Sequence, residues 1–505
     1  MVAGRAALAA LLCSVAGSAW ADLGTAFRAY DAQQFDKAYA EFRSLAELGS
    51  PLAQLNTGMM LINGEGVQTD ATQGLGWVLA ARDNGSGAAG NVLKELESKF
   101  SAEQTSAAQE QVKRWGKAAI RERLFPAAPD ATIATRLKAA SAVEPLRVEI
   151  PDRARVEGTF GFVESIVILG RDGRVHDVWI TAAVPEDMFG GPLLDGLWRR
   201  RLQPATLDGT PTAVASTFRM SFGVYGEDAR DVPSFVKFMN ERRAAAKEGK
   251  AIVQYQFARL LAGFDELRTD EGEALRWLEE SARRGYPPAQ QYLGLCTLIG
   301  DAACRGSKVD GMETIARGAQ SGDSSAQLLM AILNLSGNDP AGHQRAALWL
   351  EPAAAGGDYQ PAKYFAALLA TAPDAAMRDP RRAYDLIKPF LSNSTAAKDP
   401  NLWQVHAAAL AGMGDFAAAV DSQRRAIARA GFLDWNADAM NERLRVYSSN
   451  RPWSGDLLEL GGLAWVPDAW SKDLEPELCD ETPEAGSRVK RCEPQSRRNV
   501  ERRQR

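Results

Sequence analysis

Histidine is scarce in this sequence, with three residues in 505: His176, His343 and His406. They lie in three separate segments, and the chain has no Cys-x-x-Cys spacing. Metal sites that use nitrogen and sulfur ligands usually combine several histidines and cysteines at short spacings. We therefore predict that the protein binds no metal, and the sequence indicates no other cofactor.

The motifs of common catalytic sites are also missing. The sequence has no Gly-x-Ser-x-Gly elbow, no Gly-rich phosphate loop and no His-Glu-x-x-His helix. Acid pairs such as Glu279-Glu280 are adjacent, so on a helix their side chains would point in different directions. We predict that the protein is not an enzyme.

A broad basic surface is missing as well. The formal net charge is −5 at pH 7, and 24% charged with 46% hydrophobic residues is ordinary for a soluble globular protein. This balance argues against binding to nucleic acid. We interpret the densest charge cluster, Arg199-Arg200-Arg201, as a solvated helix end; steering of an acidic partner is the alternative.

The apolar run near the N-terminus is short. It extends from Ala6 to Ala16, whereas a membrane-spanning helix needs about 20 apolar residues. Arg5 precedes the run and Ala19-Trp20-Ala21 follows it, as in a signal peptide. We expect residues 1–21 to be removed and the mature protein to be periplasmic, without an integral membrane segment. Lipidation at Cys13 and retention as an anchor are the alternatives.

Four cysteines remain after the expected cleavage: Cys296, Cys304, Cys479 and Cys492. An even number of cysteines in an exported chain favours disulfides. The near-neighbour pairings 296–304 and 479–492 are the simplest, because each closes a short loop. Cysteines that stay reduced in the interior are the alternative.

Glycines recur at intervals of 35–37 residues, from Gly49 to Gly85 and from Gly249 through Gly285 and Gly322 to Gly357. A period of this length is typical of solenoids built from helix pairs. Tryptophans stand eight residues before some of these glycines, at Trp77, Trp277 and Trp349. The pattern predicts two antiparallel helices per unit, with the glycine ending the second helix in a left-handed conformation.

This pattern resembles the Sel-one-like repeats, which are relatives of the tetratricopeptide repeat. The best unit includes Ala53-Gln54-Leu55 and the loop Asn63-Gly64-Glu65-Gly66-Val67, and residues 399–430 resemble a tetratricopeptide unit. Solenoids bind partners on a concave face formed by the first helix of each unit. The candidates for that face are Gln54, Asn56, Gln290, Gln291, Gln327 and Lys363.

Residues 145–226 interrupt the repeats with a different pattern. It predicts strands at 162–169 and 174–181 joined by a turn at Arg171-Asp172-Gly173, a helix at 188–202 and a last strand at 213–225. The segment resembles the C-terminal domain of the TonB energy transducers. The matching motifs are Glu157-Gly158, Asp172-Gly173-Arg174-Val175, Gln203-Pro204-Ala205 and Asp208-Gly209.

The resemblance to TonB also implies a mode of binding. Domains of that family engage extended segments of outer-membrane receptors, which implies that a peptide pairs with the last strand as an additional strand. The candidate peptide-binding residues are Val214, Ser216, Phe218, Met220, Phe222 and Arg200.

The predicted fold is mainly α, with two helical-repeat arrays that flank a small α+β domain of three antiparallel strands and one helix. The expected divisions are a signal peptide at 1–21, Sel-one-like repeats at 22–115 and 243–395, linkers at 116–144 and 227–242, the TonB-like domain at 145–226, a tetratricopeptide-like repeat and cap at 396–450, and an irregular, basic, partly disordered tail at 451–505.

We interpret the chain as a periplasmic, non-enzymatic scaffold for protein or peptide partners of the cell envelope. One alternative is an accessory component of TonB-linked, energised outer-membrane transport, which the cleavable leader and the lack of a proline-rich spacer oppose. A second alternative is an enzyme of cell-wall or β-lactam metabolism, which the lack of catalytic motifs opposes.

The intact mass of the protein purified from an expressing bacterium tests the signal peptide. We expect the mature chain to begin at Asp22, because cleavage after Ala21 leaves alanine at both positions that the peptidase recognises. The variant Ala21→Leu should keep the leader. A wild-type chain that still carries Met1 would contradict the prediction and favour the transport alternative, which needs a retained anchor.

Overall fold

The computed structural model describes residues 22–127, 130, 132–157, 159, 161–185, 188–222, 233–301, 304, 306–337, 339, 341–467, 477–484 and 487–494, with side chains except at 97, 134, 155–157 and 477–494. Over these residues the protein is mainly helical, and repeat helices accompany a small α+β part, which confirms the predicted fold class. No described helix has the length and apolarity to cross a bilayer. The predicted signal peptide lies outside the described residues.

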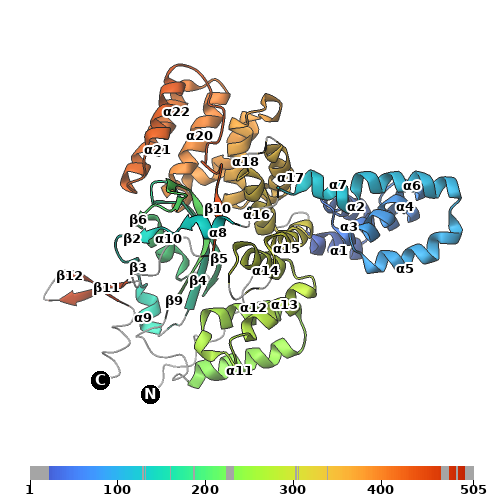
Figure 1. Ribbon diagram of the computed structural model, residues 1–505, viewed down its shortest axis with the longest axis horizontal. Helices are drawn as coiled ribbons and strands as arrows, with labels where there is room; N and C mark the ends of the chain where they lie inside the picture. Colours follow the sequence, from blue (N-terminus) through green and yellow to red (C-terminus); the bar gives the residue numbers. More distant parts are fainter. Residues whose placement is uncertain are drawn as a thin grey trace.

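The first array projects from the rest of the molecule as an arm (Figure 1). Its helices are α1 (Leu23–Asp31), α2 (Phe35–Glu47), α3 (Pro51–Asn63), α4 (Ala71–Asp83), α5 (Gly87–Leu96), α6 (Ala102–Trp115) and α7 (Lys117–Leu124). Helix α3 packs along α4, and α4 also packs against α5 and α6. Helix α7 lies within the range that the sequence predicts as a linker.

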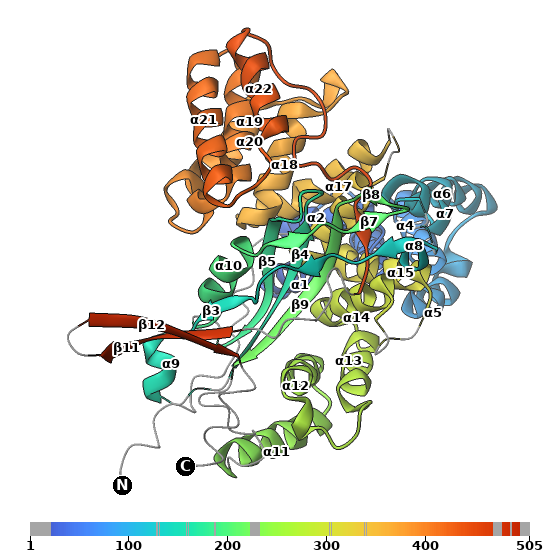
Figure 2. The ribbon, with the colours of Figure 1, turned by 60° about the vertical axis from the view of Figure 1, so that its left-hand side comes forward.

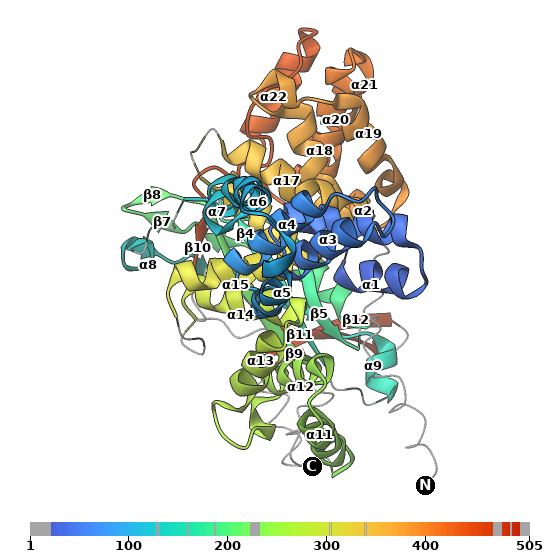
Figure 3. The same ribbon diagram turned by 90° about the vertical axis from the view of Figure 1, so that its right-hand side faces the viewer.

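The second array forms one column of helices from α11 to α22 (Figure 3). Its helices are α11 (Pro233–Lys247), α12 (Ala251–Gly263), α13 (Glu273–Arg283), α14 (Pro287–Ile299), α15 (Lys308–Gln320), α16 (Ser324–Leu335), α17 (Gly342–Ala355), α18 (Tyr359–Thr371), α19 (Pro380–Ile387), α20 (Pro400–Gly412), α21 (Phe416–Phe432) and α22 (Asp438–Ser448). Successive helices pair from α12–α13 to α20–α21. The column therefore continues through the predicted tetratricopeptide-like unit.

The repeat glycines end helices as predicted. Gly285 has φ +82° and Gly322 has φ +94°, a left-handed conformation that costs glycine little. Small residues also let the paired helices lie close together. A Cβ atom on Gly58 would lie 2.7 Å from the carbonyl oxygen of Gly74. The short spacing between α3 and α4 therefore excludes a larger side chain at this crossing.

A glutamine five residues after the repeat glycine caps the preceding helix. Gln54 donates a hydrogen bond to the Ala46 carbonyl at 3.1 Å, and Gln327 donates one to the Ala319 carbonyl at 3.0 Å. Gln254 and Gln290 bond in the same way to Ala246 and Ala282. Carbonyls in the last turn of a helix lack the usual helical partner, and each of these four also accepts the amide of the repeat glycine, so the glutamine adds a second hydrogen bond to the helix end. Gln54, Gln290 and Gln327 are therefore structural, which corrects their assignment to a concave binding face.

The central sheet has four strands in the order β10-β9-β4-β5 (Figure 2). They are β4 (Gly161–Leu169), β5 (Val175–Val184), β9 (Val214–Phe222) and β10 (Ala464–Trp465). Strand β4 is antiparallel to β5 and β9, and α10 (Gly190–Trp198) follows β5 in the chain, as predicted. Strand β10 pairs with β9 in parallel and was not predicted.

Both faces of this sheet are buried, and all nine residues of β4 are buried. On one face Val163 and Val167 lie in an apolar cluster with Leu193 of α10. On the other face Ile166 and Ile168 lie in the core shared with α14 to α18. A strand covered on both sides does not need alternating polar residues. The column of helices therefore holds the sheet as part of its own core.

The C-terminal tail forms strands where the sequence predicts irregular structure. Strands β11 (Glu477–Glu484) and β12 (Ser487–Pro494) form an antiparallel hairpin, and β11 pairs in parallel with β3 (Arg147–Glu149). The register pairs residues 477–484 with residues 487–494 over the whole length of both strands. The remaining short elements are α8 (Ile133–Arg136), α9 (Asp152–Glu157), β1 (Leu137–Lys138), β2 (Ser141–Ala142), β6 (Leu202–Gln203), β7 (Thr206–Leu207) and β8 (Thr210–Pro211).

The arm is fixed to the second array through α7. The carbonyl oxygen of Leu124 accepts hydrogen bonds from Asn334 at 3.0 Å and from the indole nitrogen of Trp349 at 2.9 Å. Arg121 forms an ion pair with Glu313 at 2.6 Å. One apolar core also runs from the arm through α14 to α18 to the sheet. The arm and the column therefore form a continuous packed body.

Replacing a capping glutamine tests its structural role. Gln327→Met keeps the length of the side chain but removes one of the two hydrogen bonds that the Ala319 carbonyl accepts, the other coming from the Gly322 amide at 3.1 Å, so we expect a loss of about 0.5–1.5 kcal/mol in the free energy of unfolding. Urea denaturation measures the change. Gln109→Met, at an exposed position of α6, is the control and should change stability by less than about 0.5 kcal/mol. Equal effects of the two substitutions would contradict the capping role.

Candidate functional site

The predicted peptide-binding strand lies inside the sheet, and its side chains face the interior. Val214, Met220 and Phe222 are buried, and the Phe222 ring stacks on Phe189 with centroids 4.4 Å apart. In β9 the main-chain groups of the odd-numbered residues point away from β4, toward the edge of the strand that β10 occupies. The carbonyls of Ala213 and Ala215 show this, because they accept hydrogen bonds from residues outside the β4–β9 pair. A peptide that pairs with this edge would therefore form hydrogen bonds with the main chain of the odd-numbered residues. The sequence suggests the even-numbered residues, one position away.

The chain itself occupies the first part of this edge. Ala464 donates a main-chain hydrogen bond to Ala213 at 3.0 Å, and Val466 donates one to Ala215 at 3.1 Å. The Ser216 hydroxyl donates to the carbonyl of Pro467 at 2.8 Å. The same segment has four residues buried in the large core shared with the column: Leu457, Leu460, Leu463 and Trp465. Residues 464–466 therefore pair with β9 as a strand, and the buried apolar residues of the same segment hold it in place.

Side chains of the column cover the opposite edge of the sheet. Gln360 of α18 donates to the Val178 carbonyl at 3.1 Å, and Asn401 of α20 donates to the His176 carbonyl at 3.0 Å. The Val178 amide donates to the carboxylate of Asp177 at 2.9 Å. Unpaired edge groups invite pairing with other chains, and these bonds remove that possibility over residues 176–178.

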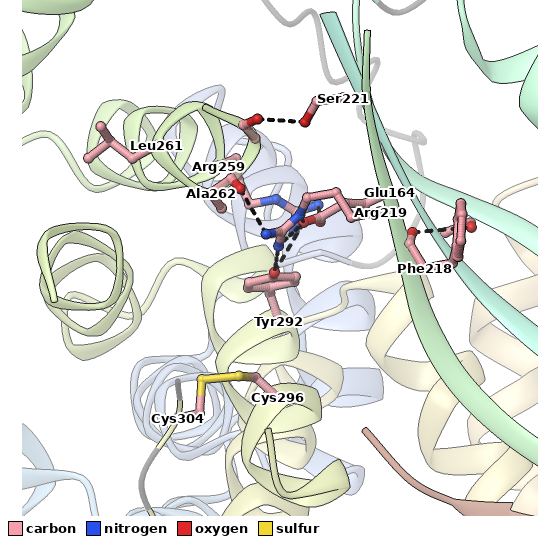
Figure 4. A network of polar contacts seen from close by, with 12 residues as sticks. Glu164, Phe218, Arg219, Ser221, Arg259, Leu261, Ala262, Tyr292, Cys296 and Cys304 are labelled. Carbon is pink, nitrogen blue, oxygen red and sulfur yellow. Dashed lines mark hydrogen bonds and ion pairs between the residues drawn. A yellow bond between two sulfur atoms is a disulfide. The ribbon is translucent and has the colours of Figure 1, made fainter. Parts of the chain in front are cut away.

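A buried glutamate joins the sheet to the lower helices of the column (Figure 4). Glu164 of β4 forms ion pairs with Arg219 of β9 and Arg259 of α12. Tyr292 of α14 donates to the same carboxylate at 3.2 Å, and the Arg259 guanidinium lies 4.0 Å from the centroid of the Tyr292 ring. Because Glu164 and Arg259 are both buried, this charge pair holds the sheet and the helices in one relative position.

A second buried cluster joins β5 to the upper helices. Lys363 of α18 lies 2.9 Å from both carboxylate oxygens of Asp177 and 2.8 Å from Asp399, which precedes α20. Tyr364 donates to Asp177 at 2.7 Å, and Tyr359 donates to Asp399 at 2.8 Å. Lys363 is fully buried, so it does not line a concave surface as its place in the sequence suggests.

The protonation of this cluster follows from its burial. Burial opposes the charged form of Lys363, but the two carboxylates outweigh it and raise the pKa of the ammonium above its usual value. Burial raises the pKa of Asp399, and Lys363 only partly offsets this. Burial and the charge of Asp177 raise the pKa of Tyr364 well above its usual value, so the hydroxyl remains a donor.

The turn between β4 and β5 fits against the loop after α21. The ring of His176 stacks on Trp435, with centroids 4.2 Å apart, and contacts the Asp172 carboxylate at 3.0 Å. The amides of Arg174 and Asn436 donate to the same carboxylate at 3.0 and 2.9 Å. Burial alone would raise the pKa of Asp172, but these contacts lower it below its usual value. The turn is therefore held by the predicted tetratricopeptide-like unit.

The structure separates Arg200 from the β9 strand. Arg200 is buried and donates to the carbonyl of Glu144 at 2.6 Å, and burial lowers the pKa of its guanidinium. Its neighbour Arg201 forms an ion pair with Asp434. Arg200 therefore supports the loop before β3 and does not join the other peptide-binding candidates.

The two predicted cysteine pairs have different outcomes. Cys296 at the end of α14 forms a disulfide with Cys304, which confirms the first pairing. The register of β11 and β12 sets Cys479 directly opposite Cys492. Opposed positions of an antiparallel pair have Cα separations that a disulfide can span, so the second pairing remains a prediction.

One cavity of about 710 Å³ opens beside α18. It lies between the turn that joins α16 to α17, the second half of α18, and residues 455–461, which cross over these helices. Its wall includes Leu368, Leu457 and Tyr364, and the Tyr364 side chain also belongs to the Asp177 cluster. The sequence does not indicate this cavity, because residues 455–461 are far along the chain from the helices that they cross.

Comparisons with known proteins identify no family for this chain. No protein-family model and no curated protein matches it. Two solved structures share part of its architecture. A protective antigen of uropathogenic Escherichia coli that displays an SLR fold has 14% identity and a TM-score of 0.30, with 84% of this chain and 83% of that chain covered. A Sel1 repeat protein from Oxalobacter formigenes has 17% identity and a TM-score of 0.27, with 75% and 86% covered.

The buried Asp177 cluster makes a quantitative prediction. Lys363→Met removes the cation and leaves two buried carboxylates without it, so we expect a loss of about 3–5 kcal/mol in the free energy of unfolding. Lys398→Met is the control, because Lys398 binds Asp195 at 2.9 Å where both side chains are largely exposed. It should cost less than about 1 kcal/mol. Equal losses, measured by urea denaturation at pH 7, would mean that the cluster does not support the docked sheet.

Proposed function

We propose that the protein is an exported, non-enzymatic scaffold that binds protein partners in the cell envelope. The observation that supports this most directly is that the column of helices already holds the sheet. Its helices hold the sheet through the Glu164 and Asp177 clusters, and the arm α1–α7 projects from this body (Figure 1). A solenoid normally offers its helices to a partner, and here the arm is the array that is not occupied by the sheet.

The sheet edge provides a second proposed surface. Strand β10 pairs with β9 at Val214 and Ala215, which supports the idea that this edge accepts an additional strand. We propose that an extended peptide of a partner pairs with β9 next to β10, beginning at Thr217. The resemblance to TonB domains implies the same mode, and main-chain bonds would supply the affinity.

The compartment is inferred from the cysteines and the leader. The disulfide between Cys296 and Cys304 is of the kind that forms in oxidising compartments and is rare in the cytosol. It supports export to the periplasm, which the N-terminal sequence predicts.

Site-specific photocrosslinking in the producing bacterium tests both surfaces. A diazirine amino acid would replace Leu52 on the arm, Thr217 on the β9 edge or Leu348 on α17. Leu52 and Leu348 are each 40% exposed, so Leu348 is a matched control for accidental collisions. We expect discrete adducts with envelope proteins at Leu52 and Thr217, and only background at Leu348.

The outcomes separate the two parts of the proposal. Adducts at Leu52 without adducts at Thr217 would remove the strand-pairing mode and keep the scaffold. Adducts at Thr217 alone would assign binding to the sheet. Equal labelling at all three positions would contradict a protein-binding scaffold that uses either surface.

A further inference from the structure

The cavity beside α18 has the form of a binding site that is present before a ligand arrives. Two main-chain hydrogen bonds hold the crossing residues in place, from Gly455 to the Thr371 carbonyl at 2.8 Å and from Gly462 to the Ser336 carbonyl at 2.9 Å. Arg378 adds a bond to the Ser454 hydroxyl at 2.7 Å. Because both ends of the crossing segment are fixed, the space beneath it does not depend on a ligand. Its volume of about 710 Å³ falls in the range of small-molecule sites.

The inner wall of this cavity is apolar. It is formed by side chains of α16, α18, the short helical turn 375–377 after α18, and the crossing segment: Leu335, Ala367, Leu368, Met377, Leu457 and Leu458. Leu368 and Leu457 belong to the main core, so the wall is backed by packed side chains. Apolar surface of this kind favours an apolar group that leaves water, by about 25 cal/mol per Å².

Two carboxylates at the mouth have no cationic partner among the residues that the structure describes. Asp374 uses one oxygen to accept the amide of Ala376 at 2.9 Å, and Asp456 uses one to accept the amide of Gly461 at 2.7 Å. Both side chains are exposed, and within the described residues neither forms an ion pair. Each therefore keeps an oxygen available to a ligand.

The cations around the mouth are already engaged. Arg345 forms an ion pair with Asp339, which also lines the cavity. Arg378 donates to the Ala372 carbonyl at 2.6 Å, and Arg171 donates to the Gly461 carbonyl at 2.6 Å. These contacts direct the guanidinium groups to the protein, whereas Asp374 and Asp456 are left to attract a positive charge.

The back of the cavity is negative too. Tyr364 separates the cavity from Asp177, Asp399 and Lys363, a group with one more carboxylate than cations. The charges of Asp177 and Asp456 both contribute to raising the pKa of Tyr364, after burial itself. Carboxylates therefore lie both behind this apolar space and at its mouth, where their charge favours a cationic ligand.

We propose that this cavity binds an apolar group that carries a cationic end. The apolar part lies against Leu368 and Leu457, and the cation lies at the mouth between Asp374 and Asp456. A small aliphatic amine has this chemistry, and so has a peptide in which a leucine stands next to a lysine. This site is separate from the β9 edge and from the arm, so it does not depend on the proposed scaffold function.

Three probes with one chain length test the proposal on the full-length protein. Octylamine is protonated at pH 7, octanoate is an anion and 1-octanol is neutral. Isothermal titration calorimetry would measure the two ions below their micelle concentrations and 1-octanol below its solubility limit. We expect octylammonium to bind roughly 3- to 10-fold more tightly than octanoate, with 1-octanol between them. The N-acetylated amides of Leu-Lys-Leu and Leu-Glu-Leu, whose only charge is the middle side chain, test the peptide source in the same way.

Two kinds of variant locate the binding. Ala341→Trp places a large side chain in the cavity wall and should abolish binding of all three octyl probes, whereas Ala417→Trp, at an exposed position of α21, should not. The double variant Asp374→Asn, Asp456→Asn should remove the preference for the cation and keep the binding of 1-octanol. These two carboxylates are exposed, so this variant tests the charge even where Ala341→Trp fails to fold.

Several results would overturn the proposal. Octanoate that binds as tightly as octylammonium would exclude a cation site, and so would an unchanged preference in the double asparagine variant. Binding that survives in folded Ala341→Trp would place the probes elsewhere. If octylammonium binds and the Leu-Lys-Leu amide does not, the ligand is a small amine. The reverse result would identify a peptide.

Discussion

Two buried carboxylates on adjacent strands determine how this protein is assembled. Glu164 on β4 and Asp177 on β5 lie on the sheet face that the column covers, away from water. A buried carboxylate without a partner is costly. Asp177 is paired with a cation of the helices, and Glu164 has one from the helices in addition to Arg219 of its own sheet. Arg259 of α12 and Lys363 of α18 supply these cations from opposite parts of the column. The sheet and the second array are therefore structurally dependent on each other, although the sequence suggests separate domains.

The repeats could be predicted from the sequence, and the docking of the sheet could not. Glycine and tryptophan spacings are local, and they gave the helix pairs and their left-handed ends correctly. The run from Phe162 to Leu169 does contain a signal of this docking. Polar and apolar residues hardly alternate in it, which is typical of a strand that is buried on both faces. A lone Glu164 within it indicates a buried partner. The glutamine five residues after a repeat glycine is another structural signal, because it caps the preceding helix. In the sequence it was interpreted as part of a binding surface.

The two-residue strand β10 shows why the edge of the sheet was missed. Ala464 and Trp465 lie in a segment without periodicity, and the pairing with β9 joins residues about 250 positions apart. Only the tertiary arrangement reveals which main-chain groups of β9 face outward. The predicted residues, which begin at Val214 and continue at every second position, have side chains that pack in the interior of the domain. Successive residues of a strand alternate in direction, so a shift of one residue gives the opposite orientation. The cavity beside α18 was missed for the same reason, because one of its walls, residues 455–461, comes from a distant part of the chain.

The attachment of the arm decides what kind of scaffold this molecule can be. If residues 116–144 were a flexible linker, the arm would move freely and its partner would have no fixed relation to the sheet. Instead the buried Leu124 carbonyl is bonded to Asn334 and Trp349, and an unsatisfied carbonyl there would cost about 1–3 kcal/mol. The Arg121–Glu313 pair and the common apolar core oppose the same movement. A hinge at α7 would have to break all of these contacts together. Surfaces on the arm and on the sheet edge are therefore held at a constant separation, which is what the proposed scaffold would need in order to position two partners.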